Sequence, residues 1–264
     1  MDPVIGALGL DGAGASGRQV AVVERGGGDA TFVVCSLLGQ ALREGRGACL
    51  LLLHSSFGHH HNVGVKLGYN LRQLRAQGRV EVLEAGKLVE GGLAPSGGEP
   101  PGAQVDAWAP GLSASTDVFS GDKEGLARAL FLDVRSSVQR LARTEGPALL
   151  VVDDLSDLLS LGVPVAGALS FLRYCRALPC GLTARAHADD DDEEQRVLAA
   201  ALAHGADVCA TVAGLGTGRS AQVSGTLAVR HKRCADAPRW NRQSLYHFRL
   251  QDRHVRLFAP GEVT

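Results

Sequence analysis

The sequence lacks several features by which whole classes of protein are recognised. Aromatic residues make up only 5% of its 264 residues, it has a single methionine, and its formal net charge is −1. Dedicated nucleic-acid-binding domains usually carry a strong basic excess, so this balance argues against that class but leaves room for a local basic patch. No apolar run approaches the ~20 residues that a membrane-spanning helix requires. These absences, with 45% hydrophobic and 21% charged residues, predict an ordinary soluble globular protein.

Cysteine pairs at metal-binding or redox spacing are also missing. The six cysteines form no CxxC motif and no ligand-like spacing with histidine. Several stand inside apolar runs, as expected for buried thiols in a reducing compartment. The opening segment MDPVIGALGLDG lacks the basic residues of a signal peptide. We therefore expect a cytoplasmic protein, with the nucleus left open as a further location.

Two runs of potential metal ligands are present, and neither predicts a metal site. His59, His60 and His61 are consecutive, so their side chains diverge on a helix or a strand and rarely converge on one ion. The six acids from Asp189 to Glu194 are typical of a solvated loop or a helix N-terminus. We predict no bound metal.

The segment Gly146–Gly162 reads GPALLVVDDLSDLLSLG and organises the chain. Its run Ala148–Val152 is apolar at every position, as a strand covered on both faces of a parallel sheet requires. Asp153 and Asp154 then fall at the carboxyl end of the strand, where open α/β sheets place their ligands. This pattern is similar to a Walker B strand of RecA-type nucleotide-binding proteins. The alternative is a central strand ended by two solvated acids that cap the next turn.

A glycine-rich turn follows the first expected strand, Val20–Glu24. Gly26, Gly27 and Gly28 lead into a helix, which is the layout of a phosphate-binding loop. Such a loop needs a lysine, yet none occurs between Arg18 and Lys66. Depending on register, the basic position is filled by Asp29, Ala30 or Phe32. We therefore predict a degenerate nucleotide loop, without a cofactor and without catalytic residues.

Strands and helices alternate along most of the chain, which predicts a parallel sheet between two helical layers, closed by antiparallel strands at the C-terminus. Residues 1–19 are expected to form a flexible arm and residues 20–264 a single domain. A Gly/Pro-rich loop is inserted at about 90–121. The fold class is thus α/β, a RecA-like three-layer sandwich without a functional phosphate-binding loop. The expected strands are Val20–Glu24, Ala48–Leu53, Val80–Leu83, Ala148–Val152, a weak Leu182–Ala186, Val208–Ala213, Leu227–Arg230, Leu245–Leu250 and Val255–Phe258.

Beyond these patterns, the chain resembles the family of the sixth subunit of the Elongator complex. The resemblance lies in SSFGHHHNVGVKLGYNL (Ser55–Leu71), GRVEVLEAGK (Gly78–Lys87) and LLVVDDLSDLLSLG with the following FLRYCRA (Leu149–Ala177). GLGTG (Gly214–Gly218) and LQDRHVRLFAPG (Leu250–Gly261) add weaker support. It covers most of residues 20–261 and lapses in the Gly/Pro-rich insert.

The resemblance implies a RecA-like subunit without the phosphate-binding lysine. It implies a six-membered ring built with the fourth and fifth subunits, two copies of each. That ring binds tRNA and docks on the catalytic part of Elongator, which modifies the wobble uridine at its 5-position. ATP hydrolysis attributed to the ring is linked to tRNA release. The chemistry belongs to another subunit, so the family supplies no catalytic residue for this chain.

Three functions stay open at this point. The favoured one is a non-catalytic ring subunit that supports tRNA handling. The second is a divergent ATPase, which Asp153 and Asp154 favour and the missing lysine opposes. The third is a DNA-recombination paralogue of RecA type, which needs a working nucleotide loop or a DNA-binding module.

Basic residues gather in the last part of the chain. Residues 228–258 contain eight Arg and Lys residues against two Asp residues: Arg230, Lys232, Arg233, Arg239, Arg242, Arg249, Arg253 and Arg256, with Asp236 and Asp252. Phosphate neutralisation drives RNA binding, and the nearby Trp240 offers a stacking surface. We take Arg230, Lys232, Arg233 and Trp240 as candidate tRNA contacts. The alternative is that the charges protect a β-edge against strand pairing.

Overall fold

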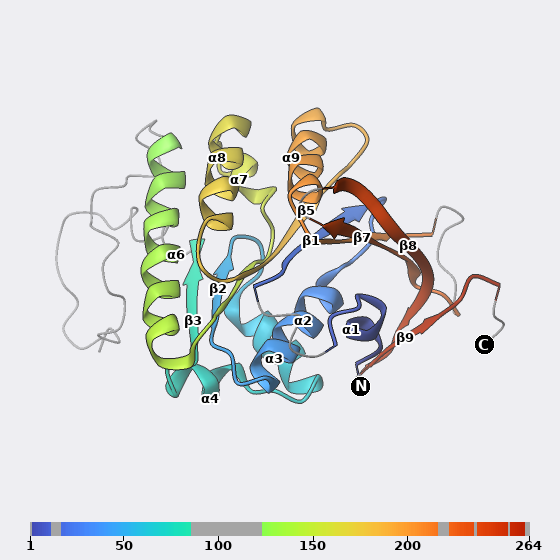
Figure 1. The fold of residues 1–264 in the computed structure, drawn as a ribbon, viewed down its shortest axis with the longest axis horizontal. Coiled ribbons are helices and arrows are strands. Elements are labelled where there is room, and N and C mark those ends of the chain that lie inside the picture. Colours follow the sequence, from blue (N-terminus) through green and yellow to red (C-terminus); the bar gives the residue numbers. More distant parts are fainter. Residues whose placement is uncertain are drawn as a thin grey trace, which may run out of the picture.

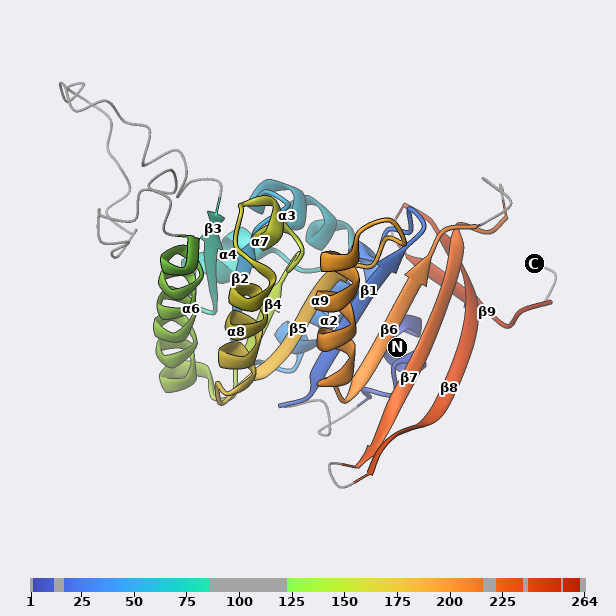
Figure 2. The same cartoon turned by 90° about the horizontal axis from the view of Figure 1, so that it is seen from above.

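The protein is an α/β sandwich with one large mixed sheet between two helical layers (Figures 1 and 2). A computed structural model describes residues 2–11, 17–85, 123–215, 222–234, 237–252 and 254–261. Figures 1 and 2 show α6, α7, α8 and α9 on one face of the sheet and α1 to α4 on the other. The predicted α/β class, with helices on both sides of a sheet, is confirmed.

The sheet has nine strands in the order β3-β2-β4-β5-β1-β6-β7-β8-β9. The neighbours from β3 to β6 pair in parallel, and β6 to β9 pair antiparallel, which confirms the predicted antiparallel strands at the C-terminus. The strands are β1 (Gln19–Arg25), β2 (Ala48–Leu52), β3 (Val80–Glu84), β4 (Leu149–Val152), β5 (Gly181–His187), β6 (Val208–Ala213), β7 (Gly225–Cys234), β8 (Ala237–Leu250) and β9 (Val255–Phe258).

Each helix lays one apolar stripe on the sheet. Leu130, Val134 and Val138 of α6 are fully buried in the core of one face, and Leu38 of α2 is buried in the core of the other. The helices are α1 (Pro3–Ala7), α2 (Thr31–Arg43), α3 (Phe57–Lys66), α4 (Leu71–Ala76), α6 (Lys123–Glu145), α7 (Asp157–Ser160), α8 (Val165–Arg176) and α9 (Glu193–His204). A continuous apolar stripe at helical spacing in the sequence therefore corresponds to a helix that packs on the sheet.

The strand expected to be weak, Leu182–Ala186, is a central one. β5 covers seven residues and pairs with β4 on one side and β1 on the other. Its sequence looks poor because Thr183 and Arg185 are polar, yet their exposed fractions are only 1% and 6%. A buried polar side chain is tolerated in such a strand when it finds partners, and Arg185 has several.

The segment expected to be a loose arm is packed over residues 3–10. Asp2 caps α1 by accepting from the N–H of Val4 at 2.9 Å, and Val4, Ile5 and Leu8 are at most 1% exposed. This helix packs against α2 and β9. The expectation is therefore wrong for these residues, because their apolar side chains join the core on the face of the sheet that α2 covers. Residues 12–16, like the expected insert at 90–121, lie outside the described residues.

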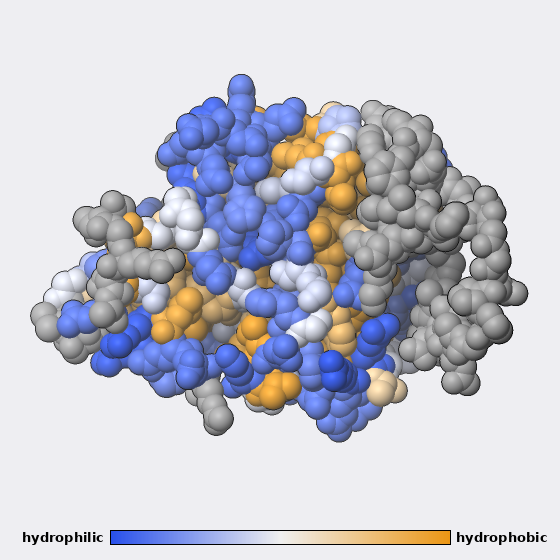
Figure 3. All heavy atoms as spheres, turned by 180° about the vertical axis from the view of Figure 1, so that it is seen from behind, coloured by the Kyte–Doolittle hydropathy of each residue, from blue (hydrophilic) through white to orange (hydrophobic). Residues whose placement is uncertain are grey.

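Large exposed apolar side chains are scattered over the described surface. They are Val65, Leu132, Tyr174, Val197, Leu245 and Leu250, which belong to five different elements. Figure 3 shows the side opposite to that of Figure 1, where apolar areas lie between polar ones. Of the helices in the described ranges, none is at once long enough and apolar enough to cross a membrane.

Candidate functional site

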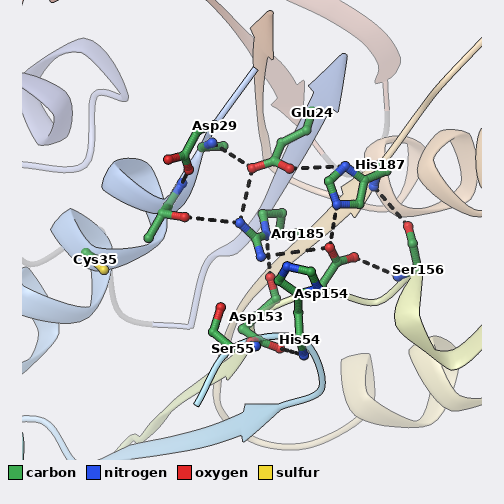
Figure 4. A network of polar contacts seen from close by, with 12 residues as sticks. Glu24, Asp29, Cys35, His54, Ser55, Asp153, Asp154, Ser156, Arg185 and His187 are labelled. Atoms are coloured by element: carbon green, nitrogen blue, oxygen red, sulfur yellow. Dashed lines mark hydrogen bonds and ion pairs between the residues drawn. The ribbon is translucent and has the colours of Figure 1, made fainter. Parts of the chain in front are cut away.

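Charged side chains from four parallel strands meet at the carboxyl edge of the sheet (Figure 4). Glu24 lies near the end of β1, Arg185 and His187 near the end of β5, and Asp153 and Asp154 directly after β4. The loop after β2 adds His54 and Ser55. Because parallel strands present their carboxyl ends at one edge, residues far apart in the sequence form one cluster.

Arg185 is the hub of this cluster. Its Nη1 donates to Glu24 Oε1 at 3.1 Å and to Thr31 Oγ1 at 3.2 Å, and its Nε donates to the carbonyl oxygen of Asp153 at 2.5 Å. Its Nη2 lies 3.8 Å from Asp154 Oδ2. The side chain is only 7% exposed, so its charge is neutralised within the protein rather than by water.

The start of helix α2 is occupied by the protein's own carboxylates. Glu24 Oε1 accepts from the N–H of Ala30 at 2.6 Å, and Asp29 Oδ1 accepts from the N–H of Thr31 at 2.8 Å. The free N–H groups of a helix N-terminus attract anions. Here the carboxylates of Glu24 and Asp29 accept hydrogen bonds from two of these N–H groups.

The predicted glycine turn connects β1 to this helix. Gly26 and Gly27 have φ values of 52° and 67°, a left-handed conformation that suits glycine. A Cβ atom on Gly28 would stand 2.9 Å from the carbonyl oxygen of Val212, so the turn packs tightly against the end of β6. The conformation and the packing of the turn therefore explain why glycine stands at these positions, without any bound ligand.

Asp153 fastens the loop that follows β2. Its Oδ1 accepts from the N–H groups of Leu53 and His54 at 2.7 and 3.3 Å, and its Oδ2 accepts from the N–H of Ser55 at 2.7 Å. Burial raises the pKa of this carboxyl, but the nearby imidazole of His60 and the hydrogen bonds from the three backbone amides outweigh it and hold the pKa below its usual range. Asp153 is therefore an ionised carboxylate committed to backbone amides.

Asp154 is fully buried and faces the other way. Its Oδ1 accepts from the N–H of Ser156 at 2.9 Å, and its Oδ2 lies 2.7 Å from Nε2 of His187. Nδ1 of His187 lies 3.1 Å from Glu24 Oε2, so the imidazole bridges two carboxylates. The hydrogen bond to Asp154 raises the pKa of His187 more than burial lowers it.

One group in the described part of the chain has metal-ligand geometry. Ligand atoms of His54, Asp154 and Asp157 lie within 4.8 Å of one another. His54 Nδ1 already pairs with Asp157 Oδ2 at 2.9 Å, and the Arg185 guanidinium stands beside Asp154. The Arg185 guanidinium supplies positive charge beside Asp154, and the His54 ring already pairs with Asp157, so the group has no clear need for an ion.

The rings of His59 and His60 on α3 lie edge to face with 5.7 Å between centroids, so the predicted divergence of the three consecutive histidines holds only for His61. His59 is exposed at the rim of the cluster, and the ring of His61 stacks on Phe57 with 6.2 Å between centroids. His60 is 2% exposed and lies between Cys35 and Asp153, with Nδ1 4.0 Å from Cys35 Sγ and Nε2 3.8 Å from Asp153 Oδ2.

The arrangement of Cys35, His60 and Asp153 looks like a nucleophilic triad, but the thiol is unreactive. Cys35 is fully buried, and burial raises the pKa of its thiol to about 12. A thiolate is the reactive form of cysteine, and this pKa leaves almost none of it near neutral pH.

An open pocket of about 430 Å³ lies in front of the cluster. Its lining includes Glu24, Asp29 and Thr31 on one side and His54 and Ser55 on the other. The ionisable side chains of the lining are of both kinds: the acids Glu24 and Asp29, Arg185, and the histidines His54, His59 and His187.

Sequence reasoning found Asp153, Asp154 and the glycine turn but missed Glu24, Arg185 and His187. Glu24 is visible as an acid ending an apolar strand. Arg185 and His187 belong to the strand that the sequence predicts only weakly. Their alternation with Ala184 and Ala186 is the pattern that would have indicated a strand there.

The candidate tRNA contacts lie away from this cluster. Arg230 and Lys232 are on β7, and Arg230 pairs with Cys209 near the start of β6. They therefore lie at the amino-terminal end of the parallel strands, whereas the cluster lies at the carboxyl end. Arg230 Nη2 contacts Cys209 Sγ at 3.8 Å, and Lys232 Nζ donates to the carbonyl oxygen of His204 at 3.2 Å. The side chains of Arg233 and Trp240 lie outside the described residues.

Comparison with known proteins gives a consistent result. Residues 11–252 match the family model described as Elongation complex protein 6. Proteins named Elongator complex protein 6 from Danio rerio, Homo sapiens and Xenopus laevis are 32%, 31% and 30% identical to this chain, and each alignment covers 88% of this chain and 87% of the relative. The resemblance found in the sequence is confirmed, and the chain belongs to the Elongator complex protein 6 family.

Proposed function

We propose that this protein is a non-catalytic subunit of the Elongator complex. In this proposal it forms a hetero-hexameric RecA-like ring with the fourth and fifth subunits, and the ring supports tRNA binding and release during wobble-uridine modification. The names of the relatives support membership of the complex. The ring and its role in tRNA handling follow from the family resemblance.

The fold supports the RecA-like part of the proposal. A glycine turn joins the first strand to a helix, and an acid pair follows a strand at the centre of a parallel sheet. Only one strand, β5, separates β1 from β4, so the turn and the acid pair come close at one edge. This is the placement that a nucleotide-binding ancestor requires.

One observation carries the non-catalytic part: carboxylates of the chain itself cap the helix that would receive phosphate. Glu24 and Asp29 accept from the N–H groups of Ala30 and Thr31. A phosphate placed there would meet two negative charges and no lysine. Losing the charge-assisted hydrogen bond alone costs on the order of 1.5–3 kcal/mol. Asp153, the Walker-B-like acid, is likewise committed to three amides.

The test is nucleotide binding and hydrolysis by the purified chain. We expect no saturable binding of Mg²⁺-ATP by calorimetry and no steady hydrolysis above a heat-denatured control. Hydrolysis that Asp154→Asn abolishes while Asp157→Asn leaves it intact would contradict the proposal. The two acids are near neighbours, so the pair controls for general disturbance of the cluster.

Membership of the ring is tested by assembly. We expect co-expression with the fourth and fifth subunits to yield a particle of two copies each by multi-angle light scattering. A chain that stays monomeric with both partners, or that co-purifies with DNA-repair subunits instead, would argue for the DNA-recombination alternative.

Direct tRNA contact is proposed for Arg230, Lys232, Arg233 and Trp240. The basic excess of β7 and β8 supports it. In the assembled ring, Glu at the three basic positions should weaken tRNA binding and reduce the log–log salt slope by roughly 0.7–0.9 per lost phosphate contact. An intact ring with unchanged affinity and slope would identify these residues as ordinary surface.

A divergent ATPase is the second candidate. The observation that favours it is the 430 Å³ pocket, which opens at the glycine turn beside the acid pair. If the ring, but not the chain alone, hydrolyses ATP, the Glu24→Gln variant decides whether this pocket contributes. Rates should be unchanged if hydrolysis belongs to the neighbouring subunits.

A further inference from the structure

A small cavity lies at the amino end of the parallel strands, on the face of the sheet that α1 and α2 cover (Figure 1). The charged cluster of Figure 4 lies at the other end of the same strands. The cavity has a volume of about 20 Å³, which is room for one water molecule or one monatomic ion. Most of its described lining is apolar, and the polar side chains in it are Arg18, Gln40, Arg46 and Thr183.

Two of these side chains hold buried polar atoms that find no hydrogen-bond partner in the described part of the chain. Oγ1 of Thr183 is one such atom, and this residue is only 1% exposed. Nε and Nη1 of Arg46 are the others, while Nη2 of the same guanidinium pairs with Glu44 Oε2 at 2.9 Å. A buried donor without an acceptor is costly, and native structures almost always supply one. Because both side chains line the same cavity, one acceptor placed there would satisfy them together.

The end of α2 holds Arg46 in this position. Gly45 has a φ of 80°, and its N–H donates to the carbonyl oxygen of Leu42 at 3.2 Å. The N–H of Arg46 donates to the carbonyl oxygen of Ala41 at 3.0 Å. This pair of bonds is the Schellman motif, which ends a helix and redirects the chain. The side chain of Arg46 is only 11% exposed, so the turn places a charged group against the sheet rather than in water.

Glycine at the start of β5 leaves space for the guanidinium. A Cβ atom on Gly181 would stand 3.7 Å from Nη1 of Arg46. Gly181 and Thr183 are two residues apart on one strand, so they face the same side of the sheet and lie ~6.6 Å apart. An atom between these positions can therefore lie about 3 Å from both the guanidinium and the hydroxyl, which is hydrogen-bond distance.

The charges around the cavity favour an anion over a water molecule. The described lining contains two arginines and no acidic residue. The amide of Gln40 is engaged at both ends, because Nε2 donates to Glu44 Oε1 at 2.7 Å and Oε1 accepts from Arg43 Nη2 at 3.3 Å. A water molecule needs acceptors for its own hydrogens, whereas an anion only accepts. Positively charged donors in an apolar setting hold an anion by strong, charge-assisted hydrogen bonds.

We propose that this cavity binds one small monovalent anion of the size of chloride, held by the N–H groups of Arg46 and the hydroxyl of Thr183. The anion joins the end of α2 to the central strand β5. It also gives a partner to Thr183, which lacks one among the described residues. The site is separate from the proposed function, because it lies at the end of the strands away from the glycine turn and the acid pair.

The test is thermal unfolding of the full chain at constant ionic strength, with gluconate replaced stepwise by chloride. Gluconate is too large for a cavity of about 20 Å³, so it does not compete for the site. An ion that binds only the folded state raises the melting temperature as its concentration exceeds its dissociation constant. We expect about 0.15 M chloride to raise the melting temperature of the wild type by about 3 °C, and bromide to act alike.

Three variants locate the effect. Thr183→Val removes the hydroxyl at nearly constant shape and should reduce the chloride shift to less than about 1 °C. Thr183→Ser keeps the hydroxyl and should keep the shift. The matched control is Thr211→Val on β6, which makes the same change on the opposite face of the sheet and should also keep the shift. Each variant is compared with itself in two salts, so a general loss of stability does not change the result.

The second readout is the line width of the chloride NMR signal, which grows when chloride exchanges with a protein site. The wild type should broaden the signal. Arg46→Lys keeps the positive charge but lacks the Nε and Nη1 donors, and it should lose at least about half of the excess line width, as should Thr183→Val.

Two results would overturn the proposal. A wild type without a chloride shift would mean that water fills the cavity. A shift and an excess line width that Thr183→Val and Arg46→Lys both retain would mean that chloride binds elsewhere on the protein.

Discussion

The two charged regions of this protein differ in where their counter-charges come from. At the carboxyl edge of the parallel strands, Arg185 and His187 are held against Glu24 and Asp154 within the fold. On the antiparallel strands, Arg249 faces another arginine. The first region is neutralised by the chain itself and therefore contributes to folding. In the second, no ion pair of Arg249 or Arg256 is found among the residues that the structure describes.

The glycine turn and the acid pair suggest a ligand site at the carboxyl edge of the sheet, but the charges there are already paired within the chain. A site that resembles a nucleotide pocket turns out to be filled with ion pairs, because a carboxylate caps α2 and amides hold Asp153. A β-hairpin that resembles ordinary surface is the region with repelling charges. Ligand binding is thus better sought where the charges are unsatisfied than where the motif is familiar.

The largest expected effect comes from removing the hub of the paired region. Arg185→Met leaves Glu24 and Asp154 buried with less counter-charge, and we expect the free energy of unfolding to fall by about 3–5 kcal/mol in urea titration. The matched control is Arg140→Met, whose exposed ion pair with Glu81 should be worth about 0–1 kcal/mol. Similar losses in the two variants would remove the distinction between buried and exposed pairs.

Asp153→Asn should cost about 2–3 kcal/mol, because an amide cannot accept from three N–H groups as a carboxylate does. The folded-state pKa of Asp153 is below its unfolded value, so this stability is present above about pH 4 and is lost as pH falls through the folded pKa. Chemical denaturation from pH 3 to 7 should therefore show a wild-type advantage that shrinks in acid.

Asp157→Asn is the control for that experiment, because the pKa of Asp157 is shifted in the opposite direction. Burial, together with the neighbouring Asp154 charge, raises the pKa of Asp157. Its carboxylate is therefore favoured in the unfolded chain, and the wild type should gain relative to the variant as pH falls through the folded pKa of Asp157, with the gain complete below about pH 4. Parallel pH trends for the two variants would contradict the different environments of the two acids.

His187→Gln should have a smaller and pH-dependent effect. Because the hydrogen bond to Asp154 raises the pKa of His187, its contribution is complete below about pH 6.5 and is lost as pH rises through the folded value. We expect a loss on the order of 1 kcal/mol at pH 5.5 that fades by pH 9. In an Asp154→Asn background this pH dependence should shrink; if it persists, Asp154 is not its source.

The smallest effect is expected where Arg249 of β8 faces Arg256 of β9. Arg256→Glu converts a repelling cross-strand pair into an attractive one and should stabilise the fold by about 0.2–1 kcal/mol. Arg249→Glu combined with Arg256→Glu restores like charges and should give no such gain. A loss of stability in the single variant would mean that Arg256 is already matched by a charge within the chain.

The fold was predictable where one physical cause decides the local structure. Ala148–Val152 and Val208–Ala213 are apolar at nearly every position, and both form largely buried strands, β4 and β6. Asp192, the fourth of the six acids, caps α9, and Glu193 and Glu194 form its first turn, as expected for acids at a helix N-terminus. Local sequence carries enough information for such elements.

The remainder depends on partners distant in the sequence. Arg185 is acceptable inside β5 only because Glu24 and Asp154 reach it from two other strands. Helix α1 is too short to persist alone, and its start signals, Asp2 followed by Pro3, gain significance only because its apolar side chains meet the core under β9. The pairing of Arg249 with Arg256 likewise becomes visible only when the register of β8 and β9 is known.

The position of β1 also determines the order in which the chain can fold. β1 is the first strand to be synthesised, yet its neighbours are β5 and β6, with Gln19 beside Leu182 and Val20 beside Val208. At ~5–20 residues per second, a ribosome leaves β1 without either neighbour for roughly 8–30 s. Contacts this distant in sequence form slowly, and unpaired strand edges promote aggregation in the interval. A chain truncated before Gly181 would leave both edges of β1 unpaired, so the nascent chain exposes these edges until β5 and β6 have emerged.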